Sequence, residues 1–533
     1  MGYSAQRIPY RETGSFSSLV VDYLDHHPSL KAFTSHELSL RGIRTCIEQR
    51  RLVPVDRSLL VNRLRQQYQD LEMPQKVREN LEALHSPNCF TVTTAHQNNL
   101  FSGPLYFIYK IAHAIALANE LKATNTDFHF VPVFYMGTED ADLAELDHIH
   151  IEAEKIQWNT KQTGAVGRMK VDQALVSLID RLEGQLGVFA HGAQWTNLLR
   201  TCYVEGRTLA DATFRLVHAL FAAEGLLVLL PDHADLKRAF IPNIKKELTE
   251  SFTATLVQTQ ADALVVAGYK VQASPREINL FYLQEGSRQR IEKKGEQWVV
   301  NGTSLVFDHV TLLAEVDQHP ERFSPNVLLR GLYQCTLLPD VAFIGGGAEI
   351  AYWLQVKNLF AAAAVPLPVL VLRNSFLLAA PSATKRLTQL GLQAGQLFLS
   401  DDKLLALLID AETLSQRDLG EQRKIVEQLY QQLQQQAGKL DPTLIAHVTA
   451  LEKRALQGLE TLEKKLWRAI KRKHQEQQNQ LQVLKAQLFP GGHLQERHQH
   501  LGFFYAQWGK ELIDELLRHS QGLTQEFTIV QLP

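Results

Sequence analysis

The chain has 533 residues, of which 45% are hydrophobic and 21% are charged. This composition excludes wholesale disorder, and the length suits roughly two to four domains or one core with large insertions. With 55 basic and 57 acidic residues, the formal net charge is -2. A balance so close to neutral argues against a dedicated nucleic-acid-binding protein.

The pattern of cysteines and apolar segments predicts a cytoplasmic protein that does not span a membrane. The four cysteines are far apart and form no CxxC pair, which is typical of a reduced compartment. The N-terminal segment lacks the apolar stretch of a secretory signal. The longest apolar stretch, residues 359–372, contains two prolines and is shorter than the about 20 residues that a membrane helix needs.

A strand, loop, helix and strand follow one another after a mainly helical N-terminal segment. We expect strands at 89–94 and 128–135 and a helix at 105–121, which together make a βαβ unit with a right-handed crossover. Further apolar, β-branched strands are expected at residues 226–230, 341–344 and 369–372. The sequence therefore predicts a doubly wound α/β core with a parallel sheet.

Two modules are inserted into this core. The first, at about 150–225, begins strand-like and becomes helical, and the second contains hairpin signals at Gly286 and Asn301-Gly302. The core is predicted at 89–149, 226–262 and 323–380, and the two insertions at 150–225 and 263–322. A mainly helical segment, 1–88, should pack on the core. The coiled coil is predicted at 381–489, and the segment 490–533 should return to the core.

The C-terminal region is predicted to form an antiparallel coiled-coil hairpin. One helix should end near Gly438, and Asp441 should cap a second helix that has Pro442 in its first position. A single helix over 442–487 would be a rod of about 70 Å. We interpret the Gln-rich run 431–436 as a solvated helix face, and the basic cluster 471–473 likewise.

The loops that follow the core strands are the expected ligand sites, because doubly wound sheets bind ligands beyond the carboxyl ends of their strands. The first loop runs from Ala95 to Pro104 and precedes a helix, whose N-terminus favours an anion. Its glycine, Gly103, could instead only shape the turn. A single histidine such as His96 is more often structural than catalytic.

The second loop carries the densest ionisable cluster of the chain, with five acids and two histidines within residues 139–150. Its carboxylates could hold Mg²⁺, bind a substrate amine or act as a general base; alternatively, the loop is a solvated helix cap. His148 and His150 would share one face of a strand. A zinc site there needs a third ligand that the sequence does not reveal, so we assign no metal site.

The third loop, Gly345-Gly346-Gly347, lies between a strand and a helix, where glycines let a ligand approach the backbone. Ile350 stands where the dinucleotide motif GxGxxG needs its last glycine, and the Walker motif is absent from the chain. A fourth loop, residues 372–376, follows the last core strand and contains Arg373. Arg373 and Arg330, which lies upstream of the third loop, suit carboxylate or phosphate recognition, but either could pair with a structural acid.

These motifs, in this order, resemble the bacillithiol biosynthesis cysteine-adding enzyme family, BshC. The resemblance rests on LFSGPLY at 100–106, VPVFYMGTEDADLAEL at 131–146 and FSPNVLLRGLYQCTLLPDVAFIGGGAEIAYW at 323–353, together with residues 368–373 and 494–497. It implies a Rossmann-like core with two connecting insertions and a coiled coil that supports a homodimer.

The resemblance also implies a ligase, which joins the carboxyl group of cysteine to the glucosamine amine of glucosaminyl malate. Because a free carboxylate and an amine do not condense readily in water, the carboxyl group must be activated, and the Rossmann-like fold suggests ATP with Mg²⁺ as the donor. Small molecules are therefore the expected partners, without nucleic acid or membrane.

The site residues follow from the resemblance and from the loops. Catalytic roles are expected for Glu139, Asp140 and Asp142, which would bind the amine or a metal and supply a general base, and for His96. Substrate or nucleotide binding is expected from Gln97, Gly103, Tyr106, Lys110, Arg330, Gly345, Gly346, Gly347, Glu349, Tyr352 and Arg373. Of these, Arg373 would hold a carboxylate.

The chain departs from the family pattern at three positions. Ala95-His96 replaces the usual Gly-Gln, Ala141 replaces the histidine of the acidic motif, and Gly331 replaces a proline. His96 could supply the lost imidazole from the neighbouring loop. Two other functions stay open: a nucleotidyl- or sugar-modifying transferase on the same fold, and a catalytically degenerate ligand-binding coiled-coil dimer.

Overall fold

A computed structural model describes residues 2–152, 154–415 and 417–533 of the protein. The chain divides into two compact units. The larger unit comprises residues 7–377 and 493–528, and the smaller unit comprises residues 1–6, 378–492 and 529–533.

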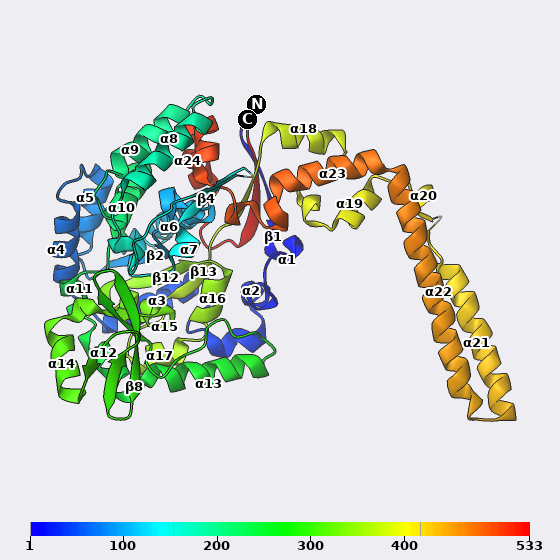
Figure 1. The fold of residues 1–533 in the computed structure, drawn as a ribbon, viewed down its shortest axis with the longest axis horizontal. Helices are drawn as coiled ribbons and strands as arrows, with labels where there is room; N and C mark the ends of the chain where they lie inside the picture. The colour runs from blue at the N-terminus through cyan, green and yellow to red at the C-terminus, as the bar shows by residue number, and fades with distance from the viewer. Residues whose placement is uncertain (1, 153, 416) are drawn as a thin grey trace. The chain divides into compact units, whose positions relative to one another are not determined.

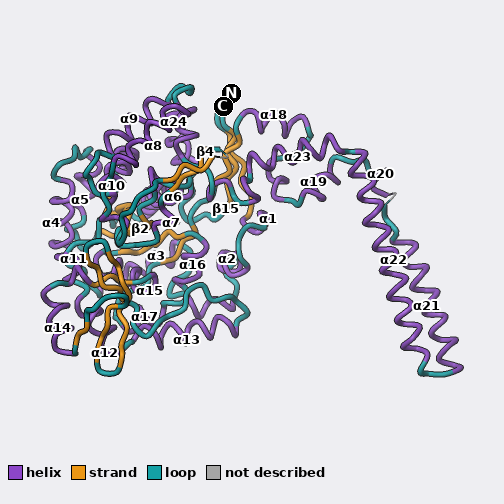
Figure 2. The backbone as a smooth tube through the Cα atoms, viewed as in Figure 1, coloured by secondary structure: helices purple, strands orange, loops and turns teal. Residues whose placement is uncertain are grey.

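A five-stranded parallel sheet forms the centre of the larger unit (Figures 1 and 2). The predicted strands are confirmed, in the order β13 (Val369–Leu372), β12 (Asp340–Gly345), β2 (Cys89–Gln97), β3 (His129–Gly137) and β6 (Leu227–Leu229). All four neighbouring pairs are parallel. Every residue of β12 is buried, as expected for a strand covered on both faces.

The order of the strands reverses next to β2. The chain first proceeds outward from β2 to β3 and β6, and then returns to β12 and β13 on the other side of β2. The first crossover is α6 (Tyr106–Thr124), which packs against β2 and β3. The predicted Rossmann-like, doubly wound core is therefore confirmed, and its reversal point lies between β2 and β12.

The N-terminal segment is mainly helical and packs on this sheet. Its helices include α2 (Ser18–Leu24), α3 (Leu40–Leu52), α4 (Arg57–Tyr68) and α5 (Gln75–Ala83). The Tyr23 hydroxyl donates to the Leu370 carbonyl, 2.6 Å away, and the Tyr68 hydroxyl accepts from the Val228 amide at 2.7 Å. The segment begins, however, with the strand β1 (Ser4–Pro9), which belongs to a second sheet with the order β1, β15 (Glu526–Gln531) and β14 (Phe376–Ala379).

Both insertions have the predicted character. The first contains β4 (His148–Ile151), β5 (Glu154–Gln157), α8 (Gln173–Leu186), α9 (Gly192–Cys202) and α10 (Leu209–Phe221). The helices α11 (Ala234–Arg238), α12 (Ile241–Glu250) and α13 (Phe252–Val266) follow β6. The second insertion is an antiparallel sheet with the order β10 (Val306–Phe307), β9 (Gln297–Val300), β8 (Ser287–Lys294), β7 (Leu280–Gln284) and β11 (Phe323–Pro325), and it includes α14 (His309–Gln318).

The remaining elements of the larger unit complete the core. The helix α15 (Val327–Leu337) leads into β12, and α16 (Gly347–Trp353) and α17 (Lys357–Ala362) lead on to β13. The C-terminal helix α24 (Leu501–His519) packs against α6 and α9 before the final strand β15 (Glu526–Gln531). The chain thus returns to the core near its end.

The smaller unit contains the predicted antiparallel hairpin, formed by α21 (Gly420–Leu440) and α22 (Leu444–Lys473) (Figure 1). Gln434 donates to the Glu452 carboxylate across the hairpin at 3.0 Å, and Arg423 pairs with Glu463 at 3.3 Å. The Gln-rich run 431–436 is mostly exposed, as predicted.

The first helix of this hairpin ends at Leu440, near Gly438 as predicted, but the predicted start of the second helix is wrong. Gly438 lies inside α21, where a Cβ atom would come within 3.0 Å of the Ile445 side chain, so the glycine permits close packing of the helices. Asp441 does not cap a helix that starts at Pro442. Its carboxylate accepts from the Thr443 amide at 2.9 Å and closes the turn, and α22 begins at Leu444.

The single rod over 442–487 is also wrong, because the helix ends at Lys473 and α23 (Gln475–Leu488) starts after His474. The apolar side chains of α23 are buried against α18 (Pro381–Gln389) and α19 (Asp401–Leu407), a different partner from that of α22. Lys485 fixes this packing by donating to the Leu399 carbonyl at 2.6 Å. The change of partner explains the interruption of the helix.

The cysteines provide a test of the packed core. All four are free and buried, and burial raises the pKa of the Cys46, Cys89 and Cys202 thiols to about 12. Burial also raises the pKa of the Cys335 thiol well above its usual range. Because only the thiolate reacts rapidly, the native protein should release almost no chromophore from Ellman's reagent at pH 8, whereas the protein in guanidinium should titrate four thiols. Rapid reaction of any native cysteine would contradict this packing.

Candidate active site

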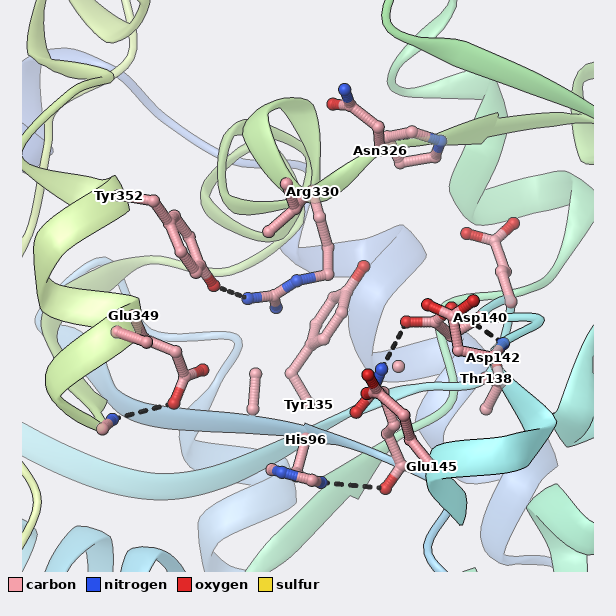
Figure 3. A pocket seen from close by; sticks show the side chains of 18 of the residues that line it. His96, Tyr135, Thr138, Asp140, Asp142, Glu145, Asn326, Arg330, Glu349 and Tyr352 are labelled. Atoms are coloured by element: carbon pink, nitrogen blue, oxygen red, sulfur yellow. Dashed lines mark hydrogen bonds between the residues drawn. The ribbon is translucent and has the colours of Figure 1, made fainter. Parts of the chain in front are cut away.

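A pocket of about 690 Å³ lies at the carboxyl ends of the strands, where the order of the sheet reverses. It is lined by the ends of β2 and β3, the start of α16 and part of the second insertion. This volume is in the range of sites for small molecules. Figure 3 shows Glu349, Tyr352 and Arg330 on one side of the pocket and Asp140, Asp142 and Glu145 on the other.

A buried ion pair joins the first and third predicted loops. Lys110 on α6 donates to the Ala95 carbonyl at 2.7 Å, and its ammonium group pairs with the Glu349 carboxylate on α16. Burial lowers the pKa of Lys110 to about 8, although Glu349 opposes this change. Burial would raise the pKa of Glu349, but Lys110 and Arg330 hold it below its usual value. The glutamate also accepts from the Gly346 amide at 2.8 Å.

Arg330 and Tyr352 form the adjoining wall. The guanidinium donates to the Tyr352 hydroxyl at 2.8 Å and lies 5.8 Å from the centre of the Tyr135 ring. Burial would lower the pKa of Arg330, but Tyr352 and Glu349 together raise it above its usual value. Arg330 is therefore a permanent cation in this wall.

His96 lies in the pocket beside the rings of Tyr106 and Phe107, with ring centres 5.2 Å and 5.7 Å away. Burial, together with the charge of Lys110, lowers its pKa to about 3. The imidazole is therefore neutral near pH 7. Its role as a substitute proton carrier stays a prediction, and this low pKa counts against it.

The three acids of the second loop have different environments. Glu139 is buried and pairs with Lys237 at 2.5 Å, so burial raises its pKa while Lys237 opposes this. Asp140 accepts from Gln97 at 2.5 Å and from the Ala141 amide at 2.7 Å. Asp142 is exposed at the mouth of the loop. Asp142 is thus the most accessible of the three to a ligand.

Arg373 has a carboxylate partner within the chain. Its two terminal nitrogens donate to the two carboxylate oxygens of Glu496, at 2.9 Å and 2.6 Å, and both side chains are buried. The prediction that Arg373 holds a substrate carboxylate is therefore replaced by its alternative, a structural ion pair. Arg373 still lies in the pocket wall, 5.4 Å from the centre of the Tyr106 ring.

Two of the predicted glycines do not line the pocket. Gly103 has a φ of +62°, and a Cβ atom there would lie 2.5 Å from the Asn99 Cβ, so it shapes the turn before α6. A Cβ atom on Gly345 would lie 2.9 Å from the Glu349 Cβ, so this glycine permits the close start of α16. Gly346 and Gly347 do face the pocket, as predicted.

Several lining residues were not found by sequence reasoning. Three arginines of the second insertion face the pocket, namely Arg276, Arg288 and Arg290, and so do Asn326 and Arg497. The alternation of Arg288 and Arg290 after the predicted turn at Gly286 could have indicated one basic face of a strand. Arg497 lies in the LQER segment that supported the resemblance.

The histidines of β4 share one face, as predicted, with ring centres 5.3 Å apart. A further imidazole, that of His498, lies beside His150, with ring centres 4.1 Å apart. Within residues 2–152, 154–415 and 417–533, no group of three histidine, cysteine or acidic side chains is arranged to hold a metal ion.

A doubly wound sheet with a charged pocket at its reversal point defines a Rossmann-like protein that binds small molecules. Comparison with known proteins identifies the family. The family model "Bacillithiol biosynthesis BshC, N-terminal Rossmann-like domain" matches residues 3–374, and the model of the BshC C-terminal coiled-coil domain matches residues 376–532. The chain therefore belongs to the bacillithiol biosynthesis BshC family.

Similar proteins match over nearly their whole length. One from Flavobacterium johnsoniae is 38% identical over 527 residues, which cover 98% of this chain and 99% of that protein. Others from Flavobacterium psychrophilum and Cytophaga hutchinsonii are 37% and 36% identical, over 98% and 96% of this chain and 99% and 96% of theirs. Each is named "Putative cysteine ligase BshC". The family and these names make the chain an enzyme of the ligase class.

The helices give no sign of a membrane span. No helix among the described residues is both long enough and apolar enough to cross a bilayer.

Removal of the Glu349 carboxylate should destabilise the larger unit, because it leaves the Lys110 ammonium buried without its partner. We expect Glu349→Gln to lower the free energy of unfolding by about 3–5 kcal/mol, and Lys110→Met combined with Glu349→Gln to recover most of this loss. Urea unfolding followed by circular dichroism measures both. Glu145→Gln, which neutralises an exposed carboxylate of the same pocket, is the control and should change stability by less than about 0.5 kcal/mol. Equal stabilities of Glu349→Gln and the unmodified protein would refute the role of the ion pair.

Proposed function

We propose that this enzyme joins the carboxyl group of cysteine to the glucosamine amine of glucosaminyl malate, which completes bacillithiol. Membership of the BshC family and the names of its relatives support this reaction. The observation that carries the proposal is the group of carboxylates facing the pocket, Asp140, Asp142 and Glu145. Carboxylates can bind a substrate ammonium group and then accept its proton.

The three predicted acids, Glu139, Asp140 and Asp142, would have different roles in binding the amine and accepting its proton. Asp140 is oriented by Gln97 and by the amides of its own loop, so it is suited to hold the amine in place. Glu139 forms a buried ion pair with Lys237, which anchors the loop. Asp142 is exposed, and we propose that it is the general base toward the glucosamine nitrogen.

Formation of the amide requires an activated cysteine carboxyl group. The amine nitrogen forms the new C–N bond and loses a proton, while one carboxyl oxygen departs with the activating donor. We propose ATP as this donor, and it would supply the leaving group. The cationic lining that includes Arg330 and Arg497 is compatible with phosphates. Because the described residues include no ready-made metal site, Mg²⁺ would enter with the nucleotide, held by its phosphates and by at most one exposed carboxylate, which leaves Asp142 free to act as the base.

We also propose that the chain works as a cytoplasmic homodimer, with the α21–α22 hairpin contributing to the interface. No residue of α21 is buried, and its apolar residues Ile425 and Leu429 are 63% and 50% exposed. A second copy of the chain could cover these side chains.

Mass spectrometry of the products tests this function. The purified protein should convert cysteine and glucosaminyl malate to a product heavier than glucosaminyl malate by one cysteinyl residue, and only when Mg-ATP is present. A product formed by transfer of a nucleotidyl group to the sugar would instead support a transferase. Absence of any product while glucosaminyl malate still binds would favour a binding module without catalysis.

Asp142→Asn should lower the rate of product formation by at least about a hundredfold, because a general base contributes rate factors of this size. The melting temperature should be unchanged, since Asp142 is exposed. The control is Asp127→Asn, an exposed carboxylate that precedes β3 and so lies at the opposite edge of the sheet. Normal turnover by Asp142→Asn would show that the acidic loop is structural.

A further inference from the structure

The second insertion contributes three arginines to the pocket, Arg276, Arg288 and Arg290, which we call the arginine wall. Arg288 and Arg290 are two residues apart on β8, so both side chains project from one face of the strand. The guanidinium of Arg288 lies 4.0 Å from the centre of the Phe281 ring, and that of Arg290 lies 5.8 Å from it. Phe281 on β7 therefore supports both guanidinium groups.

Arg288 is fixed in this position. Its Nε donates to the Ser324 hydroxyl and one terminal nitrogen donates to the Pro325 carbonyl, each at 3.1 Å. The other terminal nitrogen, Nη1, lies 3.9 Å from the Asp140 carboxylate, too far for a hydrogen bond. Burial lowers the pKa of Arg288, while Asp140 opposes this. A guanidinium that is both fixed and incompletely bonded is ready to bind an anion.

Two other cations of the pocket are already paired with carboxylates. Lys110 pairs with Glu349, and Arg373 pairs with Glu496. By contrast, the side chains of Arg276 and Arg290 form no hydrogen bond or ion pair with the residues that the structure describes. The arginine wall therefore holds much of the positive charge that is available to a ligand, and Arg330 and Arg497 hold the rest.

The hairpin that carries the wall is held by the first insertion. The Thr163 hydroxyl donates to the Gly286 carbonyl, 2.7 Å away, at the turn between β7 and β8. Gly164 has a φ of +89°, and a Cβ atom there would lie 2.6 Å from the Gly286 backbone. Such a close approach leaves the hairpin little freedom, so the wall is positioned before the ligand arrives.

The ligand of the wall must also tolerate negative charge nearby, because the carboxylate of Asp140 lies next to Arg288 and those of Asp142 and Glu145 line the same pocket. A molecule that carries an amine and carboxylates together satisfies both sets of charges. A polyphosphate, like a carboxylate, can accept paired hydrogen bonds from a guanidinium group. Its larger negative charge, however, would be repelled by the acids of the pocket.

On the basis of the proposed function, we infer that the arginine wall binds the two carboxylates of the amine-bearing substrate and determines specificity for a dicarboxylate-bearing aminosugar. The amine of the same molecule then faces Asp140 and Asp142. The wall acts on binding and does not touch the reacting atoms, so it should govern KM more than kcat.

Steady-state kinetics with two aminosugars test this specificity. Arg290→Gln should raise the KM for glucosaminyl malate by about ten- to a hundredfold, the loss expected for one charged hydrogen-bonding group, with less than about a threefold change in kcat. Activity toward methyl glucosaminide, which has the amine but no carboxylates, and the KM for Mg-ATP should be unchanged. The matched control is Lys294→Gln, which removes the same charge from an exposed position of β8 outside the pocket.

Calorimetry with malate alone separates this inference from the proposed function. Malate should bind the unmodified full-length protein and bind Arg290→Gln at least about tenfold more weakly, whether or not any product is ever formed. A higher KM for Mg-ATP with an unchanged KM for glucosaminyl malate would assign the wall to phosphates and overturn the inference. Equal malate binding by the two proteins, or equal losses with both aminosugars, would also overturn it.

Discussion

The buried ion pair between Lys110 and Glu349 is the interaction on which the geometry of the site depends. Lys110 belongs to the helix that follows β2, and Glu349 to the helix that follows β12, so the pair bridges the point where the strand order reverses. Where the strand order reverses, the two helices diverge and leave a gap between them. A charge buried in that gap is costly unless an opposite charge lies beside it. The pair therefore fixes the two sides of the pocket relative to each other.

Around this bridge, long-range contacts bring together segments that are distant in the sequence. Glu496 neutralises Arg373 across 123 residues. Lys237 anchors the acidic loop through Glu139. These paired charges build the walls, while Asp142 and the arginines of the second insertion line the open pocket. In the proposed function, this distinction would let one pocket contain many charges and still bind a charged molecule.

Much of this arrangement could be predicted from the sequence, because it depends on local patterns. The five core strands are short apolar runs, and the loops after them must meet at one edge of the sheet. The partner of Arg373 could not be predicted, since nothing near it in the sequence indicates Glu496. The break at His474 was missed because the heptad pattern continues while the packing partner changes. Arg288 and Arg290 were missed because an exposed basic strand and a basic pocket wall have the same sequence pattern.

The central claim is that one aminosugar lies between the acidic loop and the arginine wall. A crystal structure of the protein with glucosaminyl malate tests it most directly. We expect the glucosamine nitrogen within hydrogen-bonding distance of Asp140 or Asp142, and the malate carboxylates bound to Arg288 and Arg290. A sugar bound in the reverse orientation, or bound outside this pocket, would contradict the account.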